Sequence, residues 1–275
     1  RILPALLFVM TLTLPLAWIY LIPVSFIDFS KSILYSLGFS SNLYFHYSGQ
    51  LYGAENALLI PFLHTWSLSV EEQYYILFPI TLLFIFKYFK KYIIHILFVF
   101  FFSSLFLADW GSKNHASFAF YALPTRGWEL ILGSILAYFE LKLRHRNKNK
   151  LFNLVMPSVG LILILFSILF FHDQMFHPSF KALIPVLGVC LIIWFSNKDE
   201  IVTRILSTKL FVGIGLISYS LYLWHYPIFA FARIIEFTQG NVIKKILLGL
   251  IILVLSIFSY YLIERPSRNK KNSFN

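Results

Sequence analysis

Two adjacent carboxylates, Glu71 and Glu72, lie in an otherwise apolar stretch, residues 64–79, which reads HTWSLSVEEQYYILFP. On a helix that begins near Ser67, the side chains of Ser67 and Glu71 share one face, and Glu72 lies about 100° away from it. This spacing predicts that one carboxylate points inward in a helical bundle while the other meets water or a different neighbour. A second interpretation stays open: with Ser67 as N-cap, both acids mark the positive end of a helix.

A charged pair is expected in residues 124–130, PTRGWEL. Pro124 suits the first turn of a helix, and Arg126 and Glu129 are three residues apart, so that they can pair. Such a pair can bind a substrate, or it can only hold the beginning of the helix. Both interpretations stay open.

Residues 218–227, SYSLYLWHYP, carry a polar stripe on an apolar segment. Ser218, Tyr222 and His225 recur at positions i, i+4 and i+7, which predicts a common helical face. Pro227 predicts a kink just beyond it. A buried histidine is usually a packing residue, but inside a membrane and beside a tyrosine it favours a functional role.

The remaining candidates are weaker. Arg1, near Pro4, precedes the first apolar run, and by itself it indicates a basic anchor at a membrane surface. The other histidines lack paired metal-ligand spacing, so no metal site is expected. Neither a GxSxG motif nor a phosphate-binding glycine loop occurs, which argues against a serine hydrolase and a nucleotide-driven pump.

The elements that must position these residues are apolar. Of the 275 residues, 59% are hydrophobic and 13% are charged, and each apolar run is long enough to cross a bilayer. The runs fall at about 3–25, 68–86, 92–108, 119–140, 152–171, 181–196, 211–232 and 242–263. We therefore expect an all-α, polytopic bundle of about eight transmembrane helices. Residues 31–46 are expected to be interfacial or re-entrant.

The net charge of +11 does not indicate nucleic-acid binding, because the basic residues gather in short loops between apolar runs. Most of the 23 Lys and Arg residues then lie on one side of the membrane, which predicts that both termini are cytoplasmic. We expect one membrane domain, residues 1–264, and a polar cytoplasmic tail, 265–275, whose basic residues suit anionic lipid headgroups.

Five stretches together resemble the acyltransferase 3 family, integral membrane O-acyltransferases of bacterial surface glycans. HTWSLSVEEQYYILFP is similar to the family's H-x-WSL-x-VEEQFY segment, and YALPTRGWELILGSILA resembles its P-x-R-x-WE-L stretch. ISYSLYLWHYPIF resembles the ISY-x-LYLWH-x-P segment, YYLIERPSR the final Y-x-x-IE-x-P motif, and RILPALL the R-x-x-R-I-x-P stretch. The matches occur in family order and span nearly the whole chain.

The resemblance implies transfer of an acyl group, most often acetyl, from acyl-CoA as co-substrate to a hydroxyl of a cell-envelope polysaccharide, lipopolysaccharide or lipid-linked sugar. No bound cofactor is implied. The family normally has two further helices before the position of Arg1, carrying the histidine assigned the central catalytic role, and the chain is therefore expected to be a fragment. The implied location is the bacterial cytoplasmic (inner) membrane.

The resemblance also implies roles for single residues. Glu71 would orient the family histidine, and Tyr222 and His225 would line the catalytic core. Arg1 would hold CoA phosphates, and His64 and Trp66 would meet the sugar. The substrate-binding candidates are completed by Ser67, Glu72, Arg126 and Glu129.

Two alternatives are retained. The chain is an inactive fragment of such an enzyme, or it is a glycan transporter or polymerase, whose helical bundles also carry inward-facing charges. The latter is expected to show inverted repeats or a large outer loop, and neither is evident in the sequence.

Overall fold

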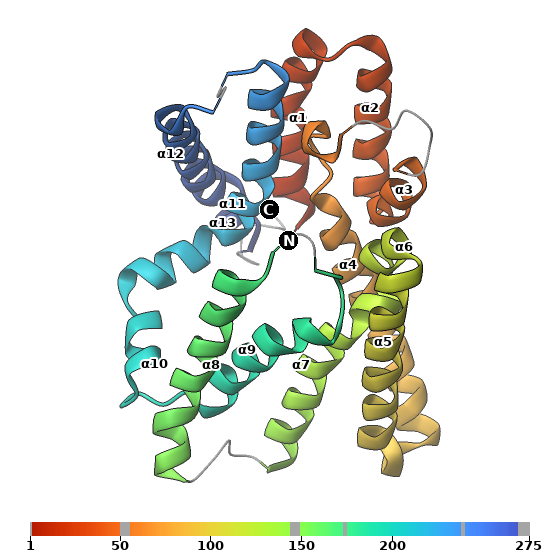
Figure 1. Cartoon of the computed structure of the whole chain (residues 1–275), viewed down its shortest axis with the longest axis vertical. Coiled ribbons are helices and arrows are strands. Elements are labelled where there is room, and N and C mark those ends of the chain that lie inside the picture. Colours follow the sequence, from red (N-terminus) through yellow and green to blue (C-terminus); the bar gives the residue numbers. More distant parts are fainter. Residues whose placement is uncertain (1, 50–55, 144–148, 173–174, 238–239, 269–275) are drawn as a thin grey trace. The chain divides into compact units, whose positions relative to one another are not determined.

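The computed structural model describes residues 2–49, 56–143, 149–172, 175–237 and 240–268 (Figure 1). Among these residues the regular elements are all helices, which confirms the predicted all-α class. The chain divides into two compact units, one formed by Arg1–Ser69 with Val212–Asn275 and the other by Val70–Phe211. Each unit is described by itself.

Unit 1 combines the two ends of the chain. Its helices are α1 (Leu3–Tyr20), α2 (Pro23–Leu37), α3 (Ser41–Ser48), η1 (Ala57–Leu59), the start of α4 (Thr65–Tyr88), most of α11 (Lys209–Ile234), α12 (Val242–Ser259), the π-helical η4 (Tyr260–Glu264) and α13 (Arg265–Arg268). Helices α1 and α2 pack side by side (Figure 1), and α1 also contacts η4. The apolar core of this unit joins α1, α2 and α11, with contributions from Leu68 of α4 and Ile252 of α12.

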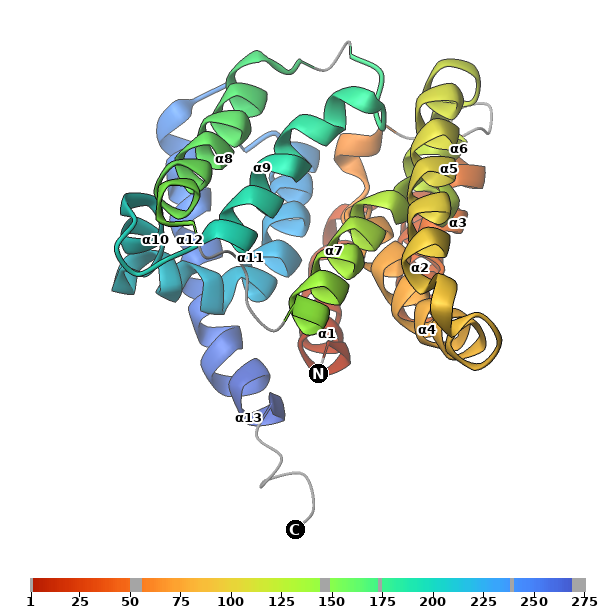
Figure 2. The same cartoon turned by 90° about the horizontal axis from the view of Figure 1, so that it is seen from below.

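Unit 2 is the central part of the chain. Its helices are the remainder of α4, η2 (Lys90–Tyr92), α5 (Ile93–Asn114), α6 (Ala116–Tyr121), α7 (Leu123–Leu143), α8 (Lys150–Phe170), η3 (Phe180–Ala182), α9 (Leu183–Phe195) and α10 (Ile201–Leu206). Helix α5 packs along α7, and α8 packs along α9, as Figure 2 shows.

Two glycines bring α8 and α9 unusually close together. A Cβ atom placed on Gly160 would lie 2.5 Å from the Gly188 carbonyl oxygen, and one on Gly188 would lie 2.6 Å from the Gly160 carbonyl oxygen. Only hydrogen atoms fit at this crossing, a kind of helix contact common in membrane proteins.

Five helical segments of the described residues are long and apolar enough to cross a bilayer. They are Leu3–Tyr20, Thr65–Tyr88, Lys90–Asn114, Lys150–Phe170 and Val242–Arg268. These five confirm five of the eight predicted crossings by length and composition, and the chain is a multi-pass membrane protein. The other three runs are also helical but less apolar or shorter: α7 and α11 carry charged and hydrogen-bonding side chains, and Phe180–Phe195 is short.

The structure corrects two boundaries. The first apolar run was expected to continue to residue 25, but α1 ends at Tyr20 and α2 begins at Pro23, because a residue before proline avoids the helical region; Ile22 has a ψ of 156°. The stretch 31–46 is divided between the end of α2 and α3. Neither helix is among the five candidate spans.

One local expectation about the helices also needs correction. Ser67 was proposed as an N-cap, but α4 begins at Thr65, so Ser67 lies inside its first turn, which contains no acid. The two glutamates therefore follow in the second turn, where the positive helix end has less influence. Pro227 lies inside α11, which continues past it to Ile234, and the kink expected there stays a prediction.

Candidate functional site

A short segment of unit 1, Ala57–His64, lies along α11 and is called the strap here. Tyr222 donates its hydroxyl to the His64 carbonyl at 2.5 Å, and Tyr226 donates to the Ala57 carbonyl at 2.8 Å. Arg233 donates to the Leu58 carbonyl at 3.4 Å. These three α11 residues share one helical face. Their side chains fix the strap by hydrogen bonds to the carbonyl groups of the strap.

The same helical face orients His225. Its Nδ1 lies 2.7 Å from the Tyr222 carbonyl oxygen, which can only accept a hydrogen bond. The neutral imidazole therefore carries its proton on Nδ1, and Nε2 keeps a lone pair that can accept a proton. The side chain of His225 is half-buried. This is a geometry suited to a general base.

His64, at the end of the strap, is buried against aromatic rings. Its side chain is 6% exposed, and its ring centroid lies 5.0 Å from that of Tyr222, 5.4 Å from that of His225 and 5.3 Å from that of Tyr226. Among the described residues, neither ring nitrogen has a hydrogen-bond partner. Burial, and to a lesser extent the nearby His225, holds the pKa of His64 well below its usual range. The Pro61 backbone acts in the opposite direction and is the smallest of the three influences, since it does not meet the geometry of a hydrogen bond to the ring.

A seam of hydroxyl groups fixes the beginning of α4. Ser36 of α2 and Thr65 of α4 share a hydrogen bond of 2.7 Å, and Ser41 of α3 and Ser69 of α4 share one of 2.8 Å. Thr65 also donates to Ser41 at 3.1 Å. All four residues are buried. The serines of the segment between α1 and α4 therefore hold the helix that follows the strap.

In the middle of α11, a buried carboxylate joins this helix to the last helices. Glu264 is fully buried in the π-helical turn η4, where it accepts from Ser220 at 2.8 Å and is paired with Arg268. One helical turn away, Trp224 donates to Ser259 at 2.7 Å. These contacts fix the register of α11 against α12 and its continuation.

In unit 2, the first turn of α7 is held by hydroxyls and by an ion pair. Ser104 of α5 donates to the Pro124 carbonyl at 2.6 Å and accepts from the Trp128 amide at 3.0 Å. The Arg126 guanidinium pairs with Glu129 at 2.9 Å and lies 5.2 Å from the centre of the Phe120 ring. The predicted pairing of Arg126 with Glu129 is confirmed.

The two glutamates of α4 belong to this charged group of unit 2. Glu71 is exposed and Glu72 is half-buried, and Glu71 is close enough to Glu72 and Glu129 for their carboxylates to repel one another. Tyr74, two residues after Glu72, is buried, and its hydroxyl shares a hydrogen bond of 2.9 Å with Ser134. Tyr74 therefore packs into unit 2, whereas Glu71, one turn before it, is exposed and lies near Glu129 of α7.

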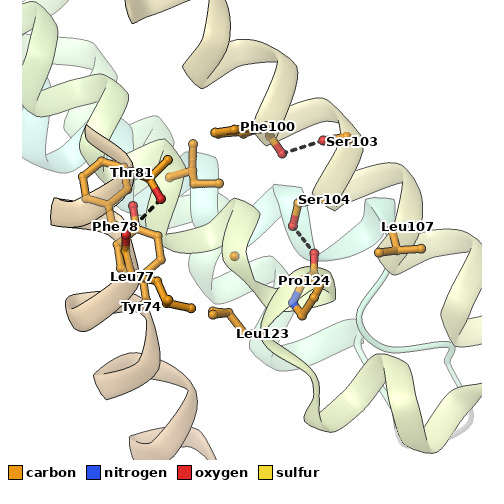
Figure 3. A pocket seen from close by; sticks show the side chains of 12 residues that line it. Tyr74, Leu77, Phe78, Thr81, Phe100, Ser103, Ser104, Leu107, Leu123 and Pro124 are labelled. Carbon is orange, nitrogen blue, oxygen red and sulfur yellow. Dashed lines mark hydrogen bonds between the residues drawn. The ribbon is translucent and has the colours of Figure 1, made fainter. Parts of the chain in front are cut away.

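An apolar pocket of about 340 Å³ lies between α4, α5 and α7 (Figure 3). Its three smaller hydroxyls are used internally, since Thr81 donates to Leu77, Ser103 to Phe100 and Ser104 to Pro124. None of the candidate site residues lines it. Its surface suits an apolar occupant and offers no group for proton transfer.

The structure thus separates the sequence candidates into two groups. Unit 1 brings together His64, Ser67, Tyr222 and His225, with Ser67 and Tyr222 hydroxyls 2.9 Å apart, whereas Glu71, Glu72, Arg126 and Glu129 belong to unit 2. Trp66 is half-buried in the first turn of α4. Arg1 and the tail beyond residue 268 lie outside the described residues.

Sequence reasoning missed part of this arrangement. Ser218, the third member of the predicted polar stripe, is exposed and donates to the Gly215 carbonyl of its own helix. Tyr226 and Arg233 were not considered, although their spacing from Tyr222 places them on one helical face. Glu264, in a quoted motif, also belonged among the candidates.

Comparison with known proteins gives matches over most of the chain. It is 29% identical to the O-acetyltransferase OatA of Staphylococcus aureus strain NCTC 8325 over 98% of the chain and 46% of the relative. It is 28% identical to the peptidoglycan O-acetyltransferase OatA of Listeria monocytogenes over 100% of the chain and 45% of the relative. The chain therefore spans less than half the length of these relatives. No solved structure matches. Residues 1–265 match the family described as an acyltransferase domain, Acyl_transf_3, and the chain belongs to this family.

Proposed function

We propose that this protein is a membrane O-acetyltransferase that moves an acetyl group from acetyl-CoA to a hydroxyl of a cell-wall glycan. The family match over residues 1–265 carries the proposal. The names of the two OatA relatives support acetyl as the group and peptidoglycan as the acceptor. The acyl-CoA donor rests on the resemblance of the sequence motifs alone.

The reaction needs a group that takes the hydroxyl proton of the acceptor. As the acceptor oxygen attacks the thioester carbonyl, a C–O bond forms and the C–S bond breaks, and the hydroxyl proton ends on the thiol of CoA. His225 is our candidate for holding this proton in between, since its ring is oriented through Nδ1 and the neutral tautomer so fixed can accept a proton at Nε2. Tyr222 contributes by fixing the strap and the beginning of α4.

The charged group of unit 2 is proposed to bind and orient. Arg126, paired with Glu129, offers a guanidinium to a carbonyl or phosphate oxygen. Glu71 is proposed to orient an imidazole, with Glu72 beside it on α4. Arg1 is proposed to bind CoA phosphates on the cytoplasmic side.

The proposed orientation follows from the charges. Lys87, Lys90 and Lys91 lie at the end of α4 and just beyond it, and the positive-inside rule places them in the cytoplasm. The strap, which precedes α4, then lies toward the outer face of the bacterial cytoplasmic membrane, where a glycan acceptor is met. Both ends of the chain are proposed to be cytoplasmic.

The proposal is tested by measuring base-labile acetyl esters on purified cell wall. Cells that lack the gene receive the complete gene, the gene with a premature stop codon, or the segment for residues 1–275 alone. Acetate released from the wall is expected with the complete gene and not with the stop codon. Equal acetate in both would reject the proposed function, and the third arm reports whether the segment suffices.

The donor is tested separately in inside-out membrane vesicles that contain the complete protein. Acetyl-CoA labelled in its acetyl group is added to the outside of the vesicles, which corresponds to the cytoplasmic side. Label is expected in glycan, with saturation in acetyl-CoA. Transfer that depends on another donor would refute acetyl-CoA while leaving the acetyltransferase assignment standing.

A further inference from the structure

His64 is a buried imidazole whose surroundings tolerate its neutral form only. Its described neighbours from α11 are Tyr222, His225 and Tyr226. From α4 the Ser67 hydroxyl donates to the His64 backbone carbonyl at 3.3 Å, and the strap contributes the Phe62 ring. None of these groups is a carboxylate, and the only charge that the His225 imidazole can carry beside His64 is positive.

A charge on His64 would therefore be buried without a counter-charge. Burying an unpaired charge is strongly unfavourable, and a second imidazolium at a ring distance of 5.4 Å adds repulsion. The neutral ring is stable there mainly through its aromatic contacts, because neither nitrogen has a hydrogen-bond partner among the described residues.

The imidazole is also placed where its departure would release a defined segment. His64 is the last residue of the strap, and its carbonyl accepts the shortest of the three hydrogen bonds that fix the strap to α11. The same residue, Tyr222, supplies both that hydrogen bond and the carbonyl that orients His225. A change at His64 is thus coupled to the position of the proposed base.

We infer that His64 is a positioning residue which, while neutral, holds the strap against α11 and which, when protonated, releases it. Acid then opens the strap and disturbs the orientation of His225. Burial lowers the pKa of His64, which agrees with this direction. The open strap therefore binds more protons than the docked strap. Docking is strongest above the pKa of the solvated imidazole, about 6.5, and weakens as the pH falls.

Hydrogen exchange of the strap amides tests the inference without any activity measurement. The complete protein in lipid nanodiscs is compared at about pH 7.5 and about pH 5, after correction for the intrinsic pH dependence of exchange. Because docked His64 stays neutral while the open form titrates near 6.5, protection of residues 58–64 is expected to fall by about thirtyfold. Unchanged protection in the wild-type protein would overturn the inference.

The variant His64→Phe removes the titrating group and keeps an aromatic ring in an aromatic site. Its strap is expected to stay protected at the lower pH, with less than about a threefold change. His95→Phe is the matched control, since His95 is an exposed histidine of unit 2, and it should behave as the wild-type protein does. A wild-type-like loss of protection in His64→Phe would assign the response to another group and reject the role of His64.

The link to catalysis rests on the proposed function and has its own readout. If the protein transfers acetyl groups, the acid limb of the pH–rate profile is expected to move to lower pH in His64→Phe. An unshifted limb would show that the strap does not position the catalytic group. If the strap amides exchange as expected but the protein transfers no acetyl groups, the proposed function is rejected and the inference is supported.

Discussion

Tyr222 of unit 1 and Arg126 of unit 2 both donate hydrogen bonds beside a candidate site, but to different kinds of partner. Tyr222 donates to a backbone carbonyl of the strap, so its bond fixes the path of the main chain. Arg126 pairs with a carboxylate one turn along its own helix. The first contact joins segments far apart in sequence, whereas the second is local, so unit 1 is expected to depend more on its polar side chains.

The helices of the two units are also packed differently. Buried hydroxyls join α2, α3 and α4 in unit 1, whereas α8 and α9 of unit 2 approach each other most closely at two glycines. Removing a hydroxyl from this seam should therefore damage unit 1, and adding a carbon at the glycine crossing should damage unit 2. The following variants test this contrast, from the largest expected effect to the smallest.

The largest effect is expected for His225→Gln. Glutamine keeps a polar side chain but cannot accept a proton near neutral pH, so acetyl transfer should fall by about 10²- to 10⁴-fold. Acetate released from the cell wall, normalised to the amount of protein in the membrane, measures it. Ser218→Ala on the same helix is the control, and its activity should be unchanged. Full activity of His225→Gln would show that His225 is not the general base.

Gly160→Ala should destabilise unit 2 by about 1–3 kcal/mol, because its new Cβ meets the backbone of α9. Gly133→Ala is the matched control, since a Cβ there has no neighbour within 4 Å. In a helix this replacement should be neutral or stabilise by about 0.5–1 kcal/mol. Thermal unfolding in detergent compares the two variants. Equal midpoints would show that the glycine crossing is looser than described.

Tyr222→Phe removes one hydroxyl and leaves the ring in place. The loss of its hydrogen bonds to the His64 carbonyl and to Ser67 should cost about 0.5–1.5 kcal/mol for each bond. Hydrogen exchange should therefore increase in the strap. Tyr138→Phe, in unit 2, provides the comparison and should leave strap exchange unaltered. If exchange spreads over all of unit 1, Tyr222 supports the whole unit and not the strap alone.

The smallest effect on stability is expected for Arg126→Met. The side chains of Arg126 and Glu129 are 19% and 33% exposed, and a partly screened pair of this kind contributes about 0.2–1 kcal/mol. Unfolding in detergent should thus change little, and a double-mutant cycle with Glu129→Gln measures the pair. A coupling far above this range would mean that unit 2 depends on its charges as strongly as unit 1 depends on its hydroxyls.

Much of the fold follows from local patterns in the sequence. The apolar runs predict helices because backbone groups in a bilayer must be satisfied within a segment, and Pro124 correctly marks the first turn of α7. The pairing of Arg126 with Glu129 was predictable for the same reason, since a three-residue spacing fixes their separation on a helix. The end of α1 could also have been found from Pro23.

Side-chain direction was less predictable. Tyr222, His225 and Ser218 were expected to form one stripe, yet only the first two face the strap, because nothing in a helical period says where the neighbouring segment ends. Glu71 was expected to face inward; its side chain is exposed, its role remains a proposal, and Tyr74, one turn along α4, is buried.

The sequence by itself determined that this chain is an all-α, multi-pass membrane protein and supplied the motifs by which its family is recognised. Only the tertiary structure decided that His64 lies against His225 and that Tyr222 joins the strap to α11. The reason is physical: helix formation and bilayer crossing depend on interactions within a few residues, whereas the contact of a buried imidazole depends on which distant segments pack together.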